Sequence, residues 1–134
     1  MGPSIEGVYE TVLYGEDLGA LHGFYAAVLG LRPVGESSIR GRAYRVGARQ
    51  LLLVFRADLT RDPHDLVPSH GARGAGHVAL RVGAGQLEAW KRRLVGAGHP
   101  IEREVTWPIG GRSIYVRDPA GNSVELVEGE VWPE

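Results

Sequence analysis

The chain has 134 residues, of which 43% are hydrophobic, and it carries 15 basic and 16 acidic side chains. This length and composition fit one globular domain with a hydrophobic core and exclude a disordered chain. The balanced charge excludes the basic surface of a nucleic-acid-binding protein, and the absence of cysteine excludes disulfides, thiolate metal sites and thiol nucleophiles.

The sequence shows no segment that would place the chain in a membrane. Its longest hydrophobic run, Leu51 to Phe55, is much shorter than a membrane-spanning helix, and the first residues lack the pattern of a signal peptide. A cysteine-free chain also fits a reducing compartment. We therefore expect a cytoplasmic protein with no membrane partner.

The first half of the chain predicts a strand, a helix and then further strands. The alternation in "GVYETVLYG" (7–15) indicates a strand. In "LHGFYAAVLGLRP" (21–33), hydrophobic residues recur at helical spacing, and Gly30 stands where the helix should end. One short strand is expected within 32–39, and "GRAYRV" and "RQLLLVFRA" indicate two more.

The second half repeats this order after a stretch rich in proline and glycine. A strand, "GHVALRVG", precedes the helix "LEAWKRRLVGAGHP" (87–100), which should end at Gly96. A short strand within 101–107 and the strands "GRSIYVRD" and "NSVELVE" follow. The repeat predicts an α+β fold of two βαβββ modules, about 5–57 and 76–129, joined by a linker at 58–75.

Strand alternation places three potential metal ligands on one side of the two modules. Side chains along a strand point alternately to opposite faces. His77 and Arg81 should therefore point away from the second helix, and the same reasoning puts Glu125 on their face of the last strand. Glu10 occupies the position of His77 in the first module. We expect Glu10, His77 and Glu125 to converge on one concave side.

Glu125 lies between apolar residues in "NSVELVE", and a buried carboxylate is costly unless its charge is compensated. A divalent cation held with Glu10 and His77 would compensate it. These ligands suit zinc, manganese, iron, cobalt or nickel, and three of them leave positions for water or substrate. Arg81 offers three alternatives: an ion pair with these acids, a contact to an anionic substrate, or simple solvation.

The remaining polar motifs are interpreted as structural. The stretch "DPAGN" (118–122) predicts a tight turn, because Pro119 fixes φ and Gly121 tolerates left-handed geometry. His22 on a helix surface and His99 after a helix end are interpreted as solvated side chains.

Three stretches in order carry a family resemblance: "VYETVLYGEDLGALHGFYAAVLGLRP", "HGARGAGHVALRV" and "GRSIYVRDPAGNSVEL". They resemble the vicinal oxygen chelate superfamily, which includes glyoxalase I, bleomycin-resistance proteins, fosfomycin-resistance enzymes and extradiol dioxygenases. The resemblance implies a curled mixed sheet around a cavity, with ligands on the first and last strands of each module. Glu10, His77 and Glu125 occupy three of these positions.

The sequence departs from that pattern at several positions. The last strand of the first module offers Leu52 or Leu53, neither of which can ligate, whereas glyoxalase I normally uses four protein ligands. Glu10 replaces a histidine of the dioxygenases and fosfomycin enzymes, so the site would be richer in oxygen. Val12 stands where the fosfomycin enzymes usually have threonine, which argues against that substrate.

The resemblance also implies roles for residues outside the ligand set. Tyr115 matches an active-site tyrosine of the dioxygenases, and His70, rather than His64, matches their acid/base histidine. Both are therefore expected to be catalytic. Tyr14 and Trp107, together with Arg81, are expected to line the cavity and bind the substrate.

Two functions follow from these observations. The first is a divalent-metal-dependent enzyme, a lyase, isomerase or dioxygenase, that stabilises negative charge on a small oxygen-rich substrate. The alternative is a metal-free small-molecule binding protein of the bleomycin-resistance type, in which Tyr14, Tyr115 and Trp107 matter more than Glu10. The resemblance and the exposed sheet edges also imply a homodimer.

Overall fold

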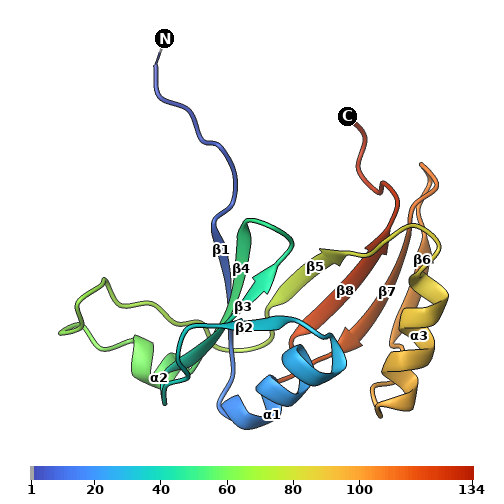
Figure 1. Ribbon diagram of the computed structural model, residues 1–134. Helices are drawn as coiled ribbons and strands as arrows, with labels where there is room; N and C mark the ends of the chain where they lie inside the picture. The colour runs from blue at the N-terminus through green and yellow to red at the C-terminus, as the bar shows by residue number, and fades with distance from the viewer. Residues whose placement is uncertain (1) are drawn as a thin grey trace. The chain divides into compact units, whose positions relative to one another are not determined.

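Two four-stranded mixed sheets form the framework of the chain, of which the structure describes residues 2–134. This computed structural model divides into two compact units, one ending at Ala72 and the other beginning at Arg73. Each unit contains a strand, a helix and three further strands in that order (Figure 1). The predicted α+β fold of two βαβββ modules is therefore confirmed.

The first unit contains β1 (Glu10–Tyr14), α1 (Leu18–His22), η1 (Gly23–Val28), β2 (Arg32–Val34), β3 (Gly41–Val46), β4 (Gln50–Phe55) and α2 (Ala57–Thr60). The strand order in its sheet is β1-β4-β3-β2. Strands β1 and β4 run parallel, and the other neighbours run antiparallel. The short helix α2 lies in the stretch that the sequence predicts as a linker.

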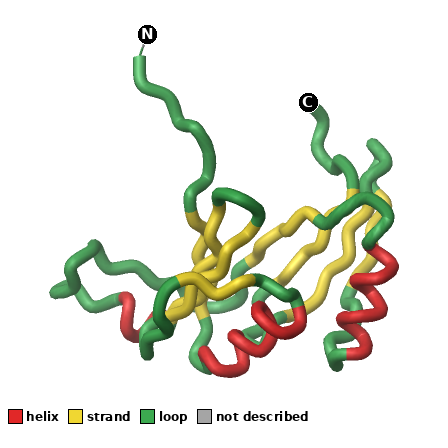
Figure 2. The backbone as a smooth tube through the Cα atoms, in the orientation of Figure 1, coloured by secondary structure: helices red, strands yellow, loops and turns green. Residues whose placement is uncertain are grey.

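The second unit contains β5 (His77–Arg81), α3 (Leu87–Gly96), β6 (Arg103–Thr106), β7 (Arg112–Arg117) and β8 (Ser123–Glu128). Its strand order, β5-β8-β7-β6, repeats that of the first unit, again with a parallel pair at one edge. Figure 2 shows the strands of each unit as one group, with few helices beside them. The internal repeat in the sequence is thus a repeat of topology.

Each sheet buries one face beneath a helix because its strands alternate apolar and polar residues. In the second unit, Leu87 and Leu94 of α3 are fully buried and face a sheet whose buried residues include Ile114, Val124 and Leu126. Full burial of each such side chain contributes about 1.5–3 kcal/mol. This packing fixes which face of the sheet remains for polar residues.

Glycines follow the helix of each unit, and in one unit the capping glycine differs from the predicted one. Helix η1 is followed by Gly30 at φ 73°, as predicted. Helix α3 contains Gly96 as its last residue, and the left-handed glycine is Gly98 at φ 88°. The predicted end of α3 at Gly96 is therefore confirmed, but the left-handed glycine that caps the helix is Gly98.

His22 is half-buried and hydrogen-bonded to a core residue of the first unit rather than fully solvated. Tyr44 is fully buried, and its hydroxyl lies 2.9 Å from Nδ1 of His22. A buried hydroxyl without a partner would be costly, so the imidazole satisfies it. The interpretation of His22 as solvated is wrong, because its partner comes from a strand distant in sequence.

The turn predicted at 118–122 is present and joins two strands of the second unit. Asp118 Oδ1 accepts hydrogen bonds from the backbone of Ala120 and Asn122, both at 2.9 Å, and Gly121 has φ 86°. Asn122 Oδ1 accepts from the backbone N–H of Gly76 at 2.7 Å. The turn therefore fixes the start of β5, one residue before His77.

Within residues 2–134, no helix combines the length and hydrophobicity that crossing a membrane requires.

Candidate functional site

The face of the second unit's sheet opposite α3 brings His77, Tyr115 and Glu125 together. Strand β8 lies between β5 and β7, and Glu125 pairs in register with Ala79 on one side and Tyr115 on the other. Ala79 and His77 lie two residues apart on one strand and so share a face. The predicted placement of His77 and Glu125 on one face is what the structure shows.

Glu125 is 6% exposed, and polar side chains lie beside both oxygens of its carboxylate. Ser113 Oγ donates a hydrogen bond of 2.6 Å to Oε2, and His77 Nε2 lies 3.3 Å from Oε1. Ser113 itself accepts a bond of 2.8 Å from the indole nitrogen of Trp107. Both carboxylate oxygens therefore have a defined polar neighbour.

His77 is held through its other ring nitrogen, and Nε2 is the nitrogen that lies near the carboxylate. Its Nδ1 lies 3.0 Å from the backbone carbonyl oxygen of Ser123, and a carbonyl can only accept, so Nδ1 carries a proton. In a neutral ring, Nε2 is then an acceptor that faces Oε1 of Glu125. Two acceptors repel unless a proton or a cation lies between them. A backbone carbonyl on the other ring nitrogen is also typical of metal-binding histidines.

The donor set fits a divalent cation. Nitrogen and oxygen ligands lie about 2.0–2.2 Å from ions such as zinc, so two neighbouring ligands of one ion are roughly 3–3.5 Å apart. The 3.3 Å between His77 Nε2 and Glu125 Oε1 lies in that range. A direct ion pair with a protonated His77 fits the same distance. The pair is thus suited to a cation, and the cation is either a metal or a proton.

Glu10, the third predicted ligand, belongs to the first unit. It begins β1, is exposed, and shares a face with Val12 and Tyr14. Within residues 2–134, neither unit contains three or more histidine, aspartate or glutamate side chains grouped as a metal site. Of the three predicted ligands, His77 and Glu125 lie together in the second unit, and Glu10 lies in the first.

The register of the first sheet resolves the choice between Leu52 and Leu53. Leu52 is 1% exposed and belongs to the core. Leu53 pairs with Val12 of β1, as Glu125 pairs with Ala79 of β5. Leu53 is therefore the counterpart of Glu125, and the first unit has no ligand at this position.

Tyr115 lies directly beside the histidine–glutamate pair. Its ring stacks on that of His77, with centroids 6.2 Å apart and an interplanar angle of 24°. Burial raises the pKa of Tyr115 above its usual value, and the negative charge of Glu125 raises it further. The phenol is therefore protonated at neutral pH and can donate a hydrogen bond.

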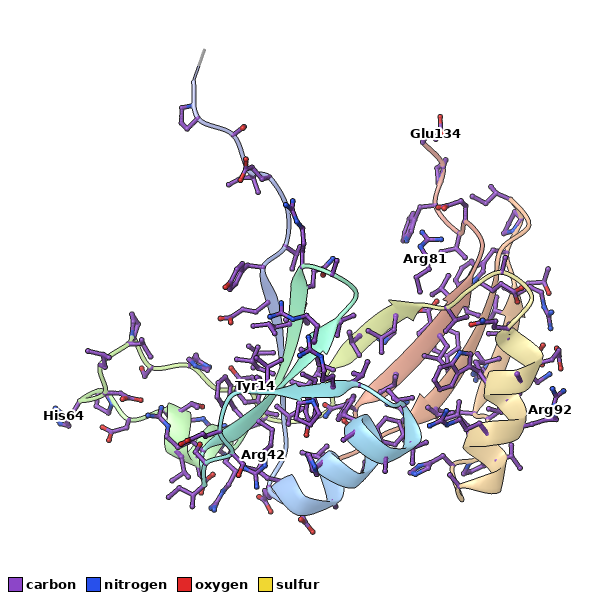
Figure 3. The ribbon with its side chains drawn as sticks, in the orientation of Figure 1. Tyr14, Arg42, His64, Arg81, Arg92 and Glu134 are labelled. Carbon is purple, nitrogen blue, oxygen red and sulfur yellow. The ribbon has the colours of Figure 1, made fainter. Side chains whose placement is uncertain are left out.

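Tyr14 and His70 come together in the first unit. The Tyr14 hydroxyl lies 2.6 Å from Nδ1 of His70, and the His70 ring also contacts Phe55, with centroids 5.4 Å apart. Burial raises the pKa of Tyr14, and the charge of Arg61 partly offsets this effect. His64 lies at the exposed outer end of the loop after α2, away from this pair (Figure 3).

Arg81 bonds to the C-terminal segment of its own unit. It donates to the carbonyl of Gly129 at 2.9 Å and forms an ion pair of 3.1 Å with Glu130, and it is exposed (Figure 3). Of the three alternatives for Arg81, an ion pair with Glu125 is not the one observed. Glu125 is compensated by Ser113 and His77 instead.

Sequence reasoning missed Ser113 and the hydrogen bond that Trp107 makes with it. Ser113 lies two residues before Tyr115 on β7, so strand alternation alone puts it on the face of Glu125. Trp107 is predicted to line the cavity, and the structure shows that its indole N–H donates to Ser113, the serine bonded to Glu125. No sequence signal indicates this contact, because it joins a turn to the strand that follows.

A separate open groove lies in the first unit and contains none of the predicted site residues. Its volume is about 760 Å³, and it is lined by Glu16, Asp17, Leu18, Ser37, Ser38, Ile39, Arg42 and Arg56. Arg56 is paired with Asp58, and Arg42 donates to the carbonyls of Ser38 and Gly41. The groove's positive charges thus already have partners.

Comparison with known proteins agrees with this fold. The model of the Glyoxalase/Bleomycin resistance protein/Dioxygenase superfamily matches residues 7–126. A lactoylglutathione lyase from Agrobacterium tumefaciens is similar in structure, with a TM-score of 0.89 and 37% identity over 96% of this chain and 98% of that one. No curated protein matches the sequence.

Two more distant structures show the same fold. A virulence protein from Salmonella typhimurium has a TM-score of 0.74 and 23% identity over 96% of this chain and 100% of that one. A glyoxalase/dioxygenase from Nostoc punctiforme has a TM-score of 0.71 and 19% identity over all of both chains, 100% each. The chain is therefore a member of the Glyoxalase/Bleomycin resistance protein/Dioxygenase superfamily.

Proposed function

We propose that the chain is a divalent-metal-dependent enzyme of this superfamily, of the lyase or isomerase class, that acts on a small oxygen-rich substrate. Glu10, His77 and Glu125 are its metal ligands. The observation that carries the proposal is the pair formed by His77 and Glu125. Nε2 of His77 lies 3.3 Å from an oxygen of the buried carboxylate, and the other ring nitrogen is held by a backbone carbonyl.

The cation, when bound, would polarise the substrate's oxygens and stabilise negative charge that develops on them. The chain's own residues supply the remaining functions. Tyr115 holds a proton beside the ligand pair and can donate it as a hydrogen bond. His70 and Tyr14 form a hydrogen-bonded pair suited to proton transfer. Arg81, whose partner Glu130 is exposed, can exchange that partner for an anionic substrate group.

A lyase or isomerase is favoured over a dioxygenase for two reasons. Glu10 replaces a histidine, so the ligand set has two carboxylates and one imidazole, which lowers the net charge of the site. The 37%-identical structure is a lactoylglutathione lyase, which makes lactoylglutathione the first substrate to test. Leu53 occupies the position that corresponds to Glu125 in the first unit and cannot bind a metal, so the site would have three protein ligands rather than four. The cysteine-free sequence supports a cytoplasmic location for the enzyme.

Metal analysis of the purified protein tests the proposal. We expect about one divalent ion per chain in the wild type, because three protein ligands hold such ions firmly. The variant that combines His77→Ala with Glu125→Gln should contain none and should still unfold cooperatively. Exposed Glu102→Gln, in which a glutamate bonded to Arg117 is changed, is the matched control and should retain the ion.

The alternative function is metal-free binding of a small molecule, as in the bleomycin-resistance proteins. The distance that favours it is the same 3.3 Å, read as a direct ion pair between protonated His77 and Glu125. In that case the wild type would be free of metal after purification and would bind no added Zn²⁺, and the enzyme proposal would fall.

A further inference from the structure

A chain of two hydrogen bonds connects the turn between β6 and β7 to the carboxylate of Glu125. The indole N–H of Trp107 can only donate, so it donates to Ser113 Oγ at 2.8 Å. The Ser113 hydroxyl must then direct its own proton to Oε2 of Glu125 at 2.6 Å. Ser113 is fully buried, so water does not compete for these bonds. The direction of both protons is fixed.

Backbone contacts hold Trp107, the first donor of these two hydrogen bonds, in place. The backbone N–H of Trp107 donates to the carbonyl of Gly111 at 2.8 Å, and the backbone N–H of Gly110 donates to the carbonyl of Trp107 at 2.9 Å. Gly111 lies so close to the C-terminal segment that an added Cβ would come within 2.3 Å of the Glu130 carbonyl oxygen. The turn therefore presents the indole nitrogen in one position.

The internal repeat provides an independent comparison. In the second unit, Ser113 pairs with Val127 and Tyr115 with Glu125. The same positions in the first unit show that Gly41 is the counterpart of Ser113 and Leu53 that of Glu125. The hydroxyl donor and the carboxylate are thus present together in one module and absent together from the other. This pairing links the role of Ser113 to Glu125 rather than to the fold.

We propose that Ser113, fixed by Trp107, is a positioning residue that holds Glu125 with Oε1 beside His77, where the cation would bind. This inference rests on the proposed function. Because Oε2 is bonded to Ser113, Oε1 is the oxygen left on the side of His77. Without the Ser113 hydroxyl the carboxylate could rotate, and Oε1 would no longer be held in that place.

Zn²⁺ titration of the full chain tests the inference with two measurements. Calorimetry gives the affinity for Zn²⁺. The ¹⁵N-resolved indole N–H resonance of Trp107 shows whether Zn²⁺ binding at Glu125 is transmitted to Trp107. This resonance is identified by its loss in Trp107→Phe. In the wild type, Zn²⁺ should shift that resonance. Ser113→Ala should weaken Zn²⁺ binding about 10- to 100-fold, as is typical for loss of a partner of a metal ligand, and should abolish the shift. Ser113→Thr keeps the hydroxyl and should retain both.

Thr106→Ala removes an exposed residue of β6 and is the matched control, which should leave affinity and shift unchanged. Trp107→Phe, which keeps an aromatic ring, should weaken binding less than Ser113→Ala because the hydroxyl remains. If Ser113→Ala binds Zn²⁺ as the wild type does, the positioning role is wrong while the proposed function stands. If the wild type binds none of Zn²⁺, Mn²⁺, Fe²⁺, Co²⁺ and Ni²⁺, the proposed function is wrong and the positioning role falls with it.

Discussion

At the scale of single residues, the structure shows how buried polar groups find partners. Glu125 is compensated by Ser113 and His77, and the hydroxyl of Tyr44 by His22. The two cases differ in chemistry. The Tyr44–His22 bond satisfies a buried hydroxyl, whereas a neutral His77 beside Glu125 leaves two acceptors next to each other unless a proton or a metal ion lies between them.

The Tyr44–His22 bond should have a measurable dependence on pH. Burial raises the pKa of Tyr44 above its usual value, so the folded state binds its proton more tightly than the unfolded state. This stability is fully present below about pH 10, the unfolded pKa of tyrosine, and decreases as the pH rises toward the folded pKa. Urea unfolding of the wild type at pH 8 and pH 10.5 should show that decrease.

Tyr44→Phe should lower the free energy of unfolding at pH 8 by about 1 kcal/mol, the typical net value of one hydrogen bond. Its stability should also decrease less between pH 8 and pH 10.5 than that of the wild type, because one shifted tyrosine is gone. An equal decrease in both proteins would contradict the assignment.

At the scale of elements, the helix ends test how the chain specifies its turns. Gly96 is the last residue of α3 and has nothing within 4 Å of an added Cβ, whereas Gly98 has φ 88°. Glycine inside a helix makes the helix less stable than alanine would, whereas a glycine at positive φ is difficult to replace because other residues are strained there. The two glycines therefore have opposite roles although they lie two residues apart.

The substitutions Gly96→Ala and Gly98→Ala should change stability in opposite directions. We expect Gly96→Ala to raise the free energy of unfolding by about 0.5–1 kcal/mol, and Gly98→Ala to lower it by about 1 kcal/mol or more. Thermal unfolding of both variants beside the wild type measures this. A stabilising Gly98→Ala would show that Gly98 does not end the helix.

The order of elements could be predicted from the sequence because strand alternation and helical spacing are local signals. They placed His77 and Glu125 on the correct face. The contacts that depend on distant residues could not be predicted. Whether Leu52 or Leu53 matches Glu125 depends on the length of the β3–β4 turn, and the partner of His22 lies on another strand. Ser113 was within reach of strand alternation, but its bond to Trp107 was not.

At the scale of the whole molecule, the repeat gives each unit the same sheet and divides the proposed ligands between them. Glu10 belongs to the first unit, and His77 and Glu125 belong to the second. The site can therefore be completed within one chain or between two chains of a homodimer. The two arrangements make different predictions for mixed dimers.

Mixing Glu10→Gln chains with His77→Ala chains after unfolding and refolding distinguishes the arrangements. If each site is built within one chain, both sites of a mixed dimer lack a ligand and no metal is bound. If the chains exchange modules, one site combines the two intact ligand sets, and mixed dimers should bind about one ion per two chains. Metal analysis of the separated mixed dimer, with sedimentation to establish its size, gives the answer. A clean monomer would exclude the homodimer.

The central claim is that Glu10, His77 and Glu125 hold one divalent cation. The most direct measurement is a crystal structure with anomalous scattering recorded at the absorption edges of manganese, iron, cobalt, nickel and zinc. The account predicts one anomalous peak about 2.0–2.2 Å from His77 Nε2, from Glu125 Oε1 and from a carboxylate oxygen of a Glu10 residue. Crystals grown with these ions that show no peak between His77 and Glu125, or a peak that Glu10 does not reach, would contradict it.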